Sequence, residues 1–528
     1  MTIDDLAYRS SGVSPAEDVA GRPRSSDLMR ALAEVESSFP THEWRVDGLS
    51  IWPLVRLRWF FSEWRSHYAS APREDLSGGG AVGYARRALS GAAAAARARW
   101  RDARGNDRGP DRRDLIYLCD GLSFSRLRDR WVERFCDPLI AMAGRCGLSS
   151  SLWTPLHRYH EPRFTPSTFV QCGIDRANIA GALRARRAAG SASLPAQTQI
   201  VEWMVAHGFG VSTLQAAKIL SDGCRVRAVA NFYRRRLERA RPRLAFVVSF
   251  YRVEGMAFVL ACRECGIPVV DIQHGVQGDM HPAYAAWPEP QGDRHSLLPD
   301  HFWVWSDWEA DVIARWSHGT GHSAIVGGNP WMNVWRAGSK WEGVTDALAR
   351  AQALKHQAGR RCVILVTLQF GLNAAEQLQG LADLLRMTSE RFAFWVRLHP
   401  AMLERREEIR GYLANAGQYE LDECTDLPLQ ALLPYTDVHL THSSTAVIDA
   451  AQYGVCSVVT TAYGAELFGP LLAAGTAHVE TGGASRLQRI LGRMVAGGRH
   501  RPPIAVPSAE AAFSKLLADA CSARRGTT

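Results

Sequence analysis

Hydrophobic and polar positions follow two alternating patterns along most of the chain. Short apolar runs at 115–121, 243–251 and 267–275 have the length and the β-branched and aromatic content of buried strands. Between such runs, apolar residues recur every three or four positions, as at 255–266, which is the spacing of a helix packed on a core. This alternation predicts a parallel sheet with helices on both faces.

A second alternating block begins after Trp341. It contains apolar strands at 361–371 and 391–400 and, after further elements, a strand and helix within 437–454. Two blocks in tandem predict an α/β protein with two doubly wound, Rossmann-like domains, whose ligands bind where the strand ends face one another across a cleft. We expect a helical, basic region at 1–110, a first domain at 111–340 and a second at 341–528.

Two further stretches carry local predictions. The segment 126–147, after the first strand, has a helix-like pattern. The segment Trp52–Tyr68 mixes aromatic residues with arginines, which suits packing on its own domain or lying on a membrane surface.

The composition is that of an ordinary globular protein with an excess of positive charge. Of 528 residues, 46% are hydrophobic and 22% charged, so neither wholesale disorder nor a polytopic membrane protein fits. The net charge of +9 draws on arginine-rich segments such as 86–104 and 231–243. These suit an anionic partner, such as a nucleotide phosphate, nucleic acid or an acidic membrane face, or simply a solvated surface.

The sequence shows no signal-peptide or membrane-spanning pattern, and its cysteines do not have metal-site spacing. The first residues include acids and lack an apolar core, and no stretch of about 18 uncharged apolar residues occurs, so we expect a cytoplasmic location. Of eleven cysteines, Cys262 and Cys265 form a C-x-x-C without a second pair or nearby histidines. We therefore expect reduced thiols and no metal site.

The stretch LTHSSTAVIDAAQYG, at 440–454, places hydroxyls between a strand and a helix that ends at a glycine. Ser443, Ser444 and Thr445 follow His442 at the predicted start of the helix. Hydroxyls in this position cap free backbone N–H groups, and the same N–H groups with the positive end of the helix dipole bind anions. Capping and phosphate binding both remain open on these residues alone.

The motif RLHP, at 397–400, ends an earlier strand of the same block. Arg397 and His399 should emerge at the carboxyl edge of the sheet, where the hydroxyl turn also lies, and Pro400 prevents the strand from continuing. A cation and an imidazole opposite a hydroxylated helix start suit a nucleotide phosphate. His399 would stabilise a departing phosphate by charge or as a proton donor. Taken alone, it is more often a strand-end histidine, and its pairing with the hydroxyl turn favours the functional interpretation.

The first block offers candidates for the other side of the cleft. Gln273, His274 and Gly275 follow a strand; the glycine permits close approach of a ligand, and the histidine donates or accepts a proton. Asp120, at the end of the first strand, is a candidate general base for an acceptor hydroxyl, although an Asp-Gly turn explains it nearly as well. Glu254, at a helix start, competes for that role or for capping.

RLHP together with LPYTDVHLTHSSTAVIDAAQYGVCSVV resembles the nucleotide-binding half of GT-B glycosyltransferases of bacterial surface polysaccharide biosynthesis. The closest likenesses are the bacterial sialyltransferase and polysialyltransferase group and the Kdo transferases. In the sialyl group an HP motif and paired serines hold the cytidine monophosphate of the donor, which would fall here on His399, Pro400, Ser443 and Ser444. The acidic-acidic-glycine motif of that group, whose carboxylate is the general base, is represented only by Cys119-Asp-Gly.

The resemblance implies a metal-independent glycosyltransferase without a cofactor. It would move a sugar of the sialic acid or Kdo type from a nucleotide donor, CMP-linked, to a bacterial surface glycan or lipid-linked glycan. The first domain would face the acceptor, the second would hold the donor, and the protein would work at the inner face of the cytoplasmic membrane.

Other functions compete with this one. The nearest is transfer of a polyol phosphate from a CDP-linked donor, as in teichoic-acid polymerases, and a nucleotide-sugar epimerase is a further choice. A non-enzymatic protein that binds nucleic acid or a membrane surface would use the arginine-rich segments. These lack the interleaved aromatic residues typical of base stacking, so no nucleic-acid partner is expected.

Overall fold

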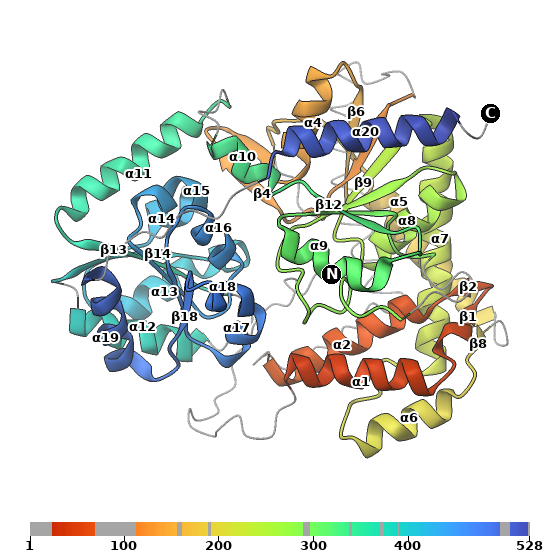
Figure 1. Cartoon of the computed structure of the whole chain (residues 1–528), viewed down its shortest axis with the longest axis horizontal. Helices are drawn as coiled ribbons and strands as arrows, with labels where there is room; N and C mark the ends of the chain where they lie inside the picture. The colour runs from red at the N-terminus through yellow and green to blue at the C-terminus, as the bar shows by residue number, and fades with distance from the viewer. Residues whose placement is uncertain are drawn as a thin grey trace.

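The computed structural model describes residues 24–68, 112–155, 161–187, 192–288, 296–336, 341–369, 374–388, 390–496 and 507–525. Figure 1 shows two α/β halves side by side, the first mainly in red to green and the second mainly in teal to blue. The arginine-rich segment at 86–104 lies outside the described residues.

The first sheet has seven parallel strands in the order β12-β11-β10-β9-β3-β6-β7. Its first strand in the chain, β3, lies inside the sheet, and the strand order reverses between β3 and β9. A reversal of this kind opens a crevice beyond the carboxyl ends of the two strands. The strands are β3 (Leu115–Leu118), β6 (Ser150–Thr154), β7 (Ser167–Phe169), β9 (Leu244–Val248), β10 (Val269–Ile272), β11 (His301–Val304) and β12 (Ser323–Val326).

The second sheet repeats this plan with six parallel strands in the order β15-β14-β13-β16-β17-β18. Here the order reverses between β13 and β16. The expected fold class, α/β with two tandem Rossmann-like domains, the architecture termed GT-B, is confirmed by these two topologies. The strands are β13 (Cys362–Thr367), β14 (Phe392–Arg397), β15 (Tyr419–Glu420), β16 (Val438–Thr441), β17 (Ser457–Val459) and β18 (Ala477–Val479).

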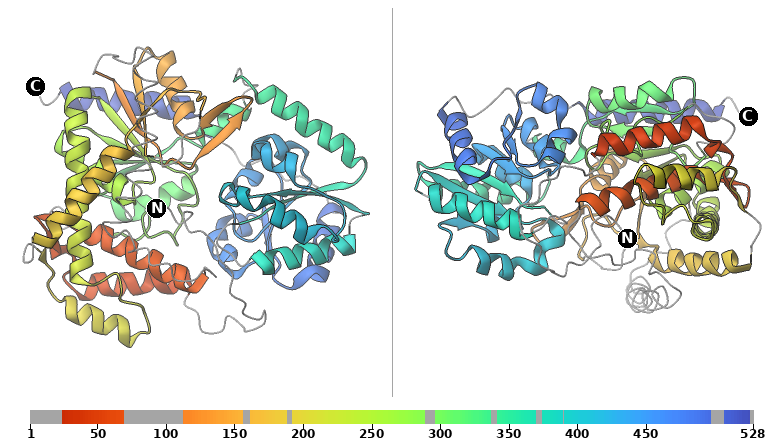
Figure 2. Two further views of the ribbon diagram at one scale, coloured as in Figure 1. Left: turned by 180° about the vertical axis from the view of Figure 1, so that it is seen from behind. Right: turned by 90° about the horizontal axis from the view of Figure 1, so that it is seen from below.

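Helices cover both faces of each sheet (Figure 2). On β3, Ile116 and Leu118 join a core that includes the helices α7 and α8, whereas Leu115 and Tyr117 join the core under α4, because successive strand residues point to opposite faces. The main helices of the first half are α4 (Cys136–Arg145), α5 (Gln171–Arg187), α6 (Gln197–Ala206), α7 (Ala216–Ala240), α8 (Val253–Glu264), α9 (Asp307–Ser317) and α10 (Pro330–Arg336). Those of the second are α11 (Val344–Ala358), α12 (Ala374–Thr388), α13 (Arg406–Leu413), α14 (Asp422–Asp426), α15 (Leu429–Leu432), α16 (Ala446–Gln452), α17 (Ala462–Leu467), α18 (Gly469–Ala473) and α19 (Gly483–Ala496).

The two N-terminal helices, α1 (Ser25–Ser38) and α2 (Trp52–Tyr68), pack into the first domain. Their apolar residues belong to the same core as β3 and α7. Most of α2 is buried, so the aromatic stretch at 52–68 packs on its own domain. The helical character expected for the N-terminal region is confirmed where the structure describes it, but these helices are continuous with the first domain's core.

The last helix departs from the expected division of the chain at 341–528. Helix α20 (Ala509–Arg525) crosses back over the first domain, as the dark blue helix in Figure 1 shows. Phe513 is buried 6.1 Å from the Phe246 ring of β9. The physical reason is that an apolar stripe of α20 covers a face of the first sheet that the other helices leave open.

The helix expected over 126–147 is wrong in its first half. Residues Phe124–Leu127 and Arg130–Glu133 form an antiparallel hairpin, β4 and β5, and a helix begins only at Cys136. The turn places Arg128 at a φ of 50°, a left-handed conformation that does not continue a helix. The two strands pair in register, with Phe124 opposite Glu133 and Leu127 opposite Arg130.

No helix among the described segments is long and apolar enough to cross a membrane.

A buried ion pair ties α1 and α2 to the body of the first domain. The Arg56 and Glu36 side chains are 0% and 3% exposed and 3.1 Å apart. Arg56 also donates to the carbonyls of Ala285 and Ala286, and its guanidinium lies 4.2 Å from the centre of the Trp287 ring.

We predict that Glu36→Ala destabilises the protein by about 3–5 kcal/mol, because it leaves the Arg56 charge buried without its counter-ion. The matched control is Glu34→Ala, an exposed position on the same helix. Thermal unfolding of both variants checks this. Equal melting temperatures for the two would contradict a role of the pair in holding α1 and α2 in place.

Candidate functional site

The hydroxyl turn at 441–445 lies at the strand reversal of the second sheet. Ser443 donates both its backbone N–H and its hydroxyl to Oε1 of Gln369, just beyond β13, at 2.6 and 2.8 Å. The Ser444 hydroxyl accepts the N–H of Ala446 at 3.3 Å. Two of the hydroxyls therefore shape the turn itself, whereas Thr445 is exposed and its side chain makes no cap hydrogen bond.

His442 connects the turn to the segment that follows β17. Its carbonyl accepts the hydroxyl of Thr461 at 2.9 Å, and its half-buried ring has a pKa lowered to about 4 by burial. The imidazole is consequently neutral at physiological pH.

His399 lies at the same edge, two residues beyond β14, and Pro400 begins the short helix η2 (Pro400–Arg405) that ends the strand direction. The pKa of His399 is lowered to about 4, first by burial and then by the positive charges of Arg134 and Arg397. Two guanidinium groups near one neutral imidazole make this edge electropositive.

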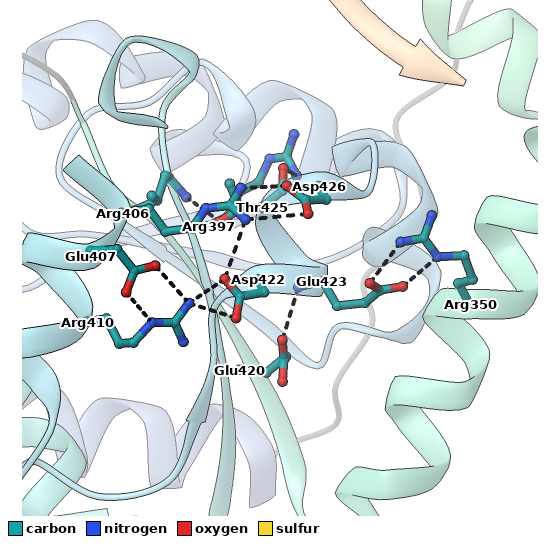
Figure 3. A network of polar contacts seen from close by, with 11 residues as sticks. Arg350, Arg397, Arg406, Glu407, Arg410, Glu420, Asp422, Glu423, Thr425 and Asp426 are labelled. Carbon is teal, nitrogen blue, oxygen red and sulfur yellow. Dashed lines mark hydrogen bonds and ion pairs between the residues drawn. The ribbon is translucent and has the colours of Figure 1, made fainter. Parts of the chain in front are cut away.

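The Arg397 side chain, expected to face a ligand phosphate, is hydrogen-bonded to backbone carbonyls instead. Its Nη1 donates to the carbonyls of Cys424, Thr425 and Leu427, which are the free carbonyls at the end of α14. Figure 3 shows Arg397 in the polar network around α13 and α14, where Arg410 pairs with Asp422 and Arg350 with Glu423. Arg397 thus anchors α14, and a direct contact with a ligand stays a prediction.

Across the interface, the loop after β10 carries Gln273, His274 and Gly275. Gln273 is fully buried and satisfied within the first domain, since it accepts the Trp305 N–H and donates to Glu309 and to the Gly275 carbonyl. A ligand role for its side chain would require these bonds to break. His274 is half-buried, with its Nε2 3.0 Å from the Tyr251 hydroxyl.

Asp120 lies at the strand reversal of the first sheet. Its carboxylate accepts the N–H groups of Leu122 and Ser123 at 2.7 and 3.0 Å and the Ser123 hydroxyl at 2.9 Å. The side chain therefore closes the turn that follows β3. Glu254 is in the first turn of α8, close to Arg252, which donates to the Asp120 carbonyl.

The two predicted motifs meet across the domains. A Cβ placed on Gly275 would lie 3.5 Å from Cγ2 of Thr445, so the loop after β10 touches the hydroxyl turn. Beside this contact, Val447 and Ile448 of α16 share an apolar cluster with Trp305 of the first domain. The structure therefore brings the Gly275 loop and the hydroxyl turn together, as expected from their places at the carboxyl ends of parallel strands.

Two functional candidates were missed by sequence reasoning. Arg134, directly after β5, acts through its charge on His399, Arg397 and Asp449 of the second domain. Asp449, on α16, is 9% exposed, lies 3.5 Å from the Asn329 amide nitrogen, and has a pKa raised to about 7 by burial. Arg134 lies in the segment 126–147, which was assigned to a helix, so the hairpin that positions it was not predicted.

Among the described residues, no group of three or more His, Cys, Asp or Glu side chains is placed to hold a metal ion. Cys262 and Cys265 are free thiols.

No protein-family model matches the sequence, and no curated protein matches it either. Several solved structures resemble the fold at low identity. UDP-GlcNAc 2-epimerase from Neisseria meningitidis, bound to UDP-GlcNAc, has 16% identity and a TM-score of 0.45 over 77% of this chain and 98% of that chain. The Methanocaldococcus jannaschii UDP-GlcNAc 2-epimerase has 12% identity and a TM-score of 0.45 over 76% and 98% of the two chains. Acinetobacter baumannii MurG has 12% identity and a TM-score of 0.38 over 77% and 99%. Likeness at this level describes the fold alone.

We predict a graded response to side chains added at Gly275. Gly275→Ala should be tolerated, because its methyl group makes an ordinary contact with Thr445. Gly275→Leu should cost about 1–3 kcal/mol and separate the domains, because the larger side chain overfills the contact.

Thermal unfolding and small-angle X-ray scattering of both variants measure these effects. Thr445→Ala, which removes the opposing methyl group, should restore part of the stability of Gly275→Leu. A leucine variant with the melting temperature and radius of gyration of the wild type would show that the two motifs are not in contact in solution.

Proposed function

We propose that the chain is a GT-B glycosyltransferase that transfers a sugar from a nucleotide donor, CMP-linked in the first instance, to a bacterial surface glycan or lipid-linked glycan. The observation that carries the proposal is the contact of the Gly275 loop with the hydroxyl turn at Thr445, on the same sheet edge as the positively charged surroundings of His399. A ligand at this edge would touch both domains.

The donor phosphate would lie against the second domain. The hydroxyl turn offers the exposed Thr445, whereas the backbone N–H groups of Ser443, Ser444 and Ala446 are already bonded inside the turn. His399 with the nearby guanidinium groups offers hydrogen-bond donors and positive charge. Charge that develops on the phosphate as the sugar leaves would be stabilised there without a metal ion. Ser443 would contribute by fixing the turn through Gln369.

The acceptor would approach from the first domain. His274 is the better candidate for the general base, because it adjoins Gly275, and the Tyr251 hydroxyl orients its ring. Asp120 is a weaker candidate than the sequence suggested, since its carboxylate already accepts three hydrogen bonds from its own turn.

We predict that a nucleotide raises the melting temperature of the wild type and that His399→Ala and Ser444→Ala reduce the shift. A ligand present at 100 times its Kd should stabilise the folded state by about 2.7 kcal/mol. Thermal-shift measurements with CMP, CDP, UDP, GDP and dTDP check this. His356→Ala, an exposed histidine on α11, is the matched control and should keep the full shift.

The nucleotide that binds separates the alternatives. A preference for CMP supports a transferase with a CMP-linked donor, and a preference for CDP supports polyol phosphate transfer. A response to UDP keeps a nucleotide-sugar enzyme and changes the donor. The proposal is contradicted if the wild-type protein responds to no nucleotide. If it also binds random nucleic acid strongly and in a salt-dependent way, the result favours a nucleic-acid-binding protein.

We also predict that nucleotide binding takes up protons at pH 5–6. Burial and two guanidinium groups hold the pKa of His399 at about 4. A phosphate beside the ring adds negative charge, favours the protonated form and raises this pKa, so uptake should be largest between the free and bound pKa values and vanish near pH 8.

Isothermal titration calorimetry in buffers of different ionisation enthalpy measures the number of protons. His399→Gln should bind nucleotide with the uptake abolished. Unchanged uptake in this variant would remove His399 from the phosphate site.

A further inference from the structure

Three buried carboxylates surround the backbone that carries Arg134. Asp120, Glu133 and Asp137 are 8%, 0% and 1% exposed, which is unusual for acidic side chains. Burying them has a cost that the fold must offset, so what they hold in place is informative. All three act on the short segment that joins β5 to α4.

Asp120 reaches Arg134 through Ser123. By accepting two N–H groups and the hydroxyl at 122–123, the Asp120 carboxylate fixes the direction of the Ser123 carbonyl. That carbonyl accepts the backbone N–H of Arg134 at 3.0 Å and its Nε at 3.3 Å. The guanidinium is thereby held at its Nε, which leaves its two Nη groups for other partners.

Glu133 and Asp137 fix the backbone on either side. Asp137 accepts the N–H of Glu133 at 2.7 Å, and Glu133 accepts the N–H groups of Phe135 and Cys136. Hydrogen bonds therefore fix the backbone of the residues immediately before and after Arg134. The pKa of Glu133 is raised to about 8, chiefly by burial, so this carboxyl group is largely protonated at neutral pH and adds little negative charge near Arg134.

The Arg134 guanidinium has no ion-pair partner among the residues that the structure describes. The titratable groups of the second domain that feel its charge are Arg397, His399 and Asp449. Asp449 is the only one of these that could neutralise it, and burial raises its pKa to about 7, which weakens it as a counter-ion. A cation fixed in place beside another cation, without a counter-ion, suits an anionic ligand.

We propose that Arg134 is the first domain's ligand for the phosphate of the bound nucleotide, and that Asp120 is a positioning residue that acts through Ser123 and Arg134. The inference rests on the proposed function and deepens it, because it names the residue that closes the site from the opposite domain. One phosphate bridges Arg134 of the first domain and the His399 edge of the second.

Loss of the Arg134 charge should weaken phosphate binding specifically. Arg134→Gln should bind CMP about 10- to 100-fold more weakly than the wild type, the loss expected for charge-assisted hydrogen bonds. Cytidine, which lacks the phosphate, should bind both proteins equally. Arg130→Gln, which removes an exposed arginine from the adjacent strand β5, is the matched control and should bind CMP like the wild type.

Equilibrium dialysis or calorimetry measures these affinities for CMP and cytidine. If the thermal-shift screen shows a preference for another nucleotide, that nucleotide and its nucleoside are used instead. Equal weakening of nucleotide and nucleoside, or CMP affinity unchanged in Arg134→Gln, overturns the assignment of Arg134 and leaves the proposed function standing. A wild type that binds no nucleotide overturns both.

Two substitutions of Asp120 separate positioning from proton transfer. In Asp120→Asn the remaining oxygen still accepts the N–H groups of Leu122 and Ser123, both of which bind Oδ1. This variant should keep CMP affinity within about 3-fold, whereas Asp120→Ala should lose as much as Arg134→Gln. The Arg134→Gln, Asp120→Ala double variant should lose no more than either single one, because the two residues act in one chain.

Additive losses in the double variant, or full CMP affinity in a folded Asp120→Ala, would overturn the positioning role. Circular dichroism and the melting temperature of each variant identify any that fail to fold. If Asp120→Ala does not fold, Asp120→Asn is compared with the wild type instead. Loss of CMP affinity in a folded Asp120→Asn also contradicts the proposal.

Discussion

The carboxyl edges of two parallel sheets face one another, and most of the candidate chemistry depends on that apposition. Each sheet reverses its strand order inside the sheet, which leaves a crevice at β3 and β9 in one domain and at β13 and β16 in the other. The edges approach closely where Gly275 faces Thr445, a place with room for a methyl group but not for a large side chain. The apolar cluster around Val447 and Trp305 holds the edges at this spacing.

The sheets were predictable because their signals are local. An apolar run such as 362–367, fully buried, has one satisfactory position, the interior of a parallel sheet. The Gly275 loop and the hydroxyl turn were predictable for the same reason, since both follow strands directly. Contacts between distant parts of the chain could not be predicted. Helix α20 returns to the first sheet because elements some 250 residues earlier leave one face of that sheet open. No local pattern encodes such a contact.

The roles of single polar residues were the hardest to predict, because hydrogen-bond geometry decides them. Arg397, Gln273 and Asp120 each have the chemistry of a ligand contact, and each is occupied by backbone groups of its own domain. Arg134 has the same side chain as dozens of surface arginines, and only its buried surroundings distinguish it. Residue type at a strand end therefore indicates where a site lies better than it indicates which atoms serve it.

The return of the last helix makes the second domain an insertion within the first. Residues 344–496 form a unit whose two flanks both lead to the first domain, and Phe513 completes the core beneath Phe246. During synthesis the first sheet would be made early and lack this cover until helix α20 leaves the ribosome. The inserted domain can therefore fold while its host still lacks one helix of its cover.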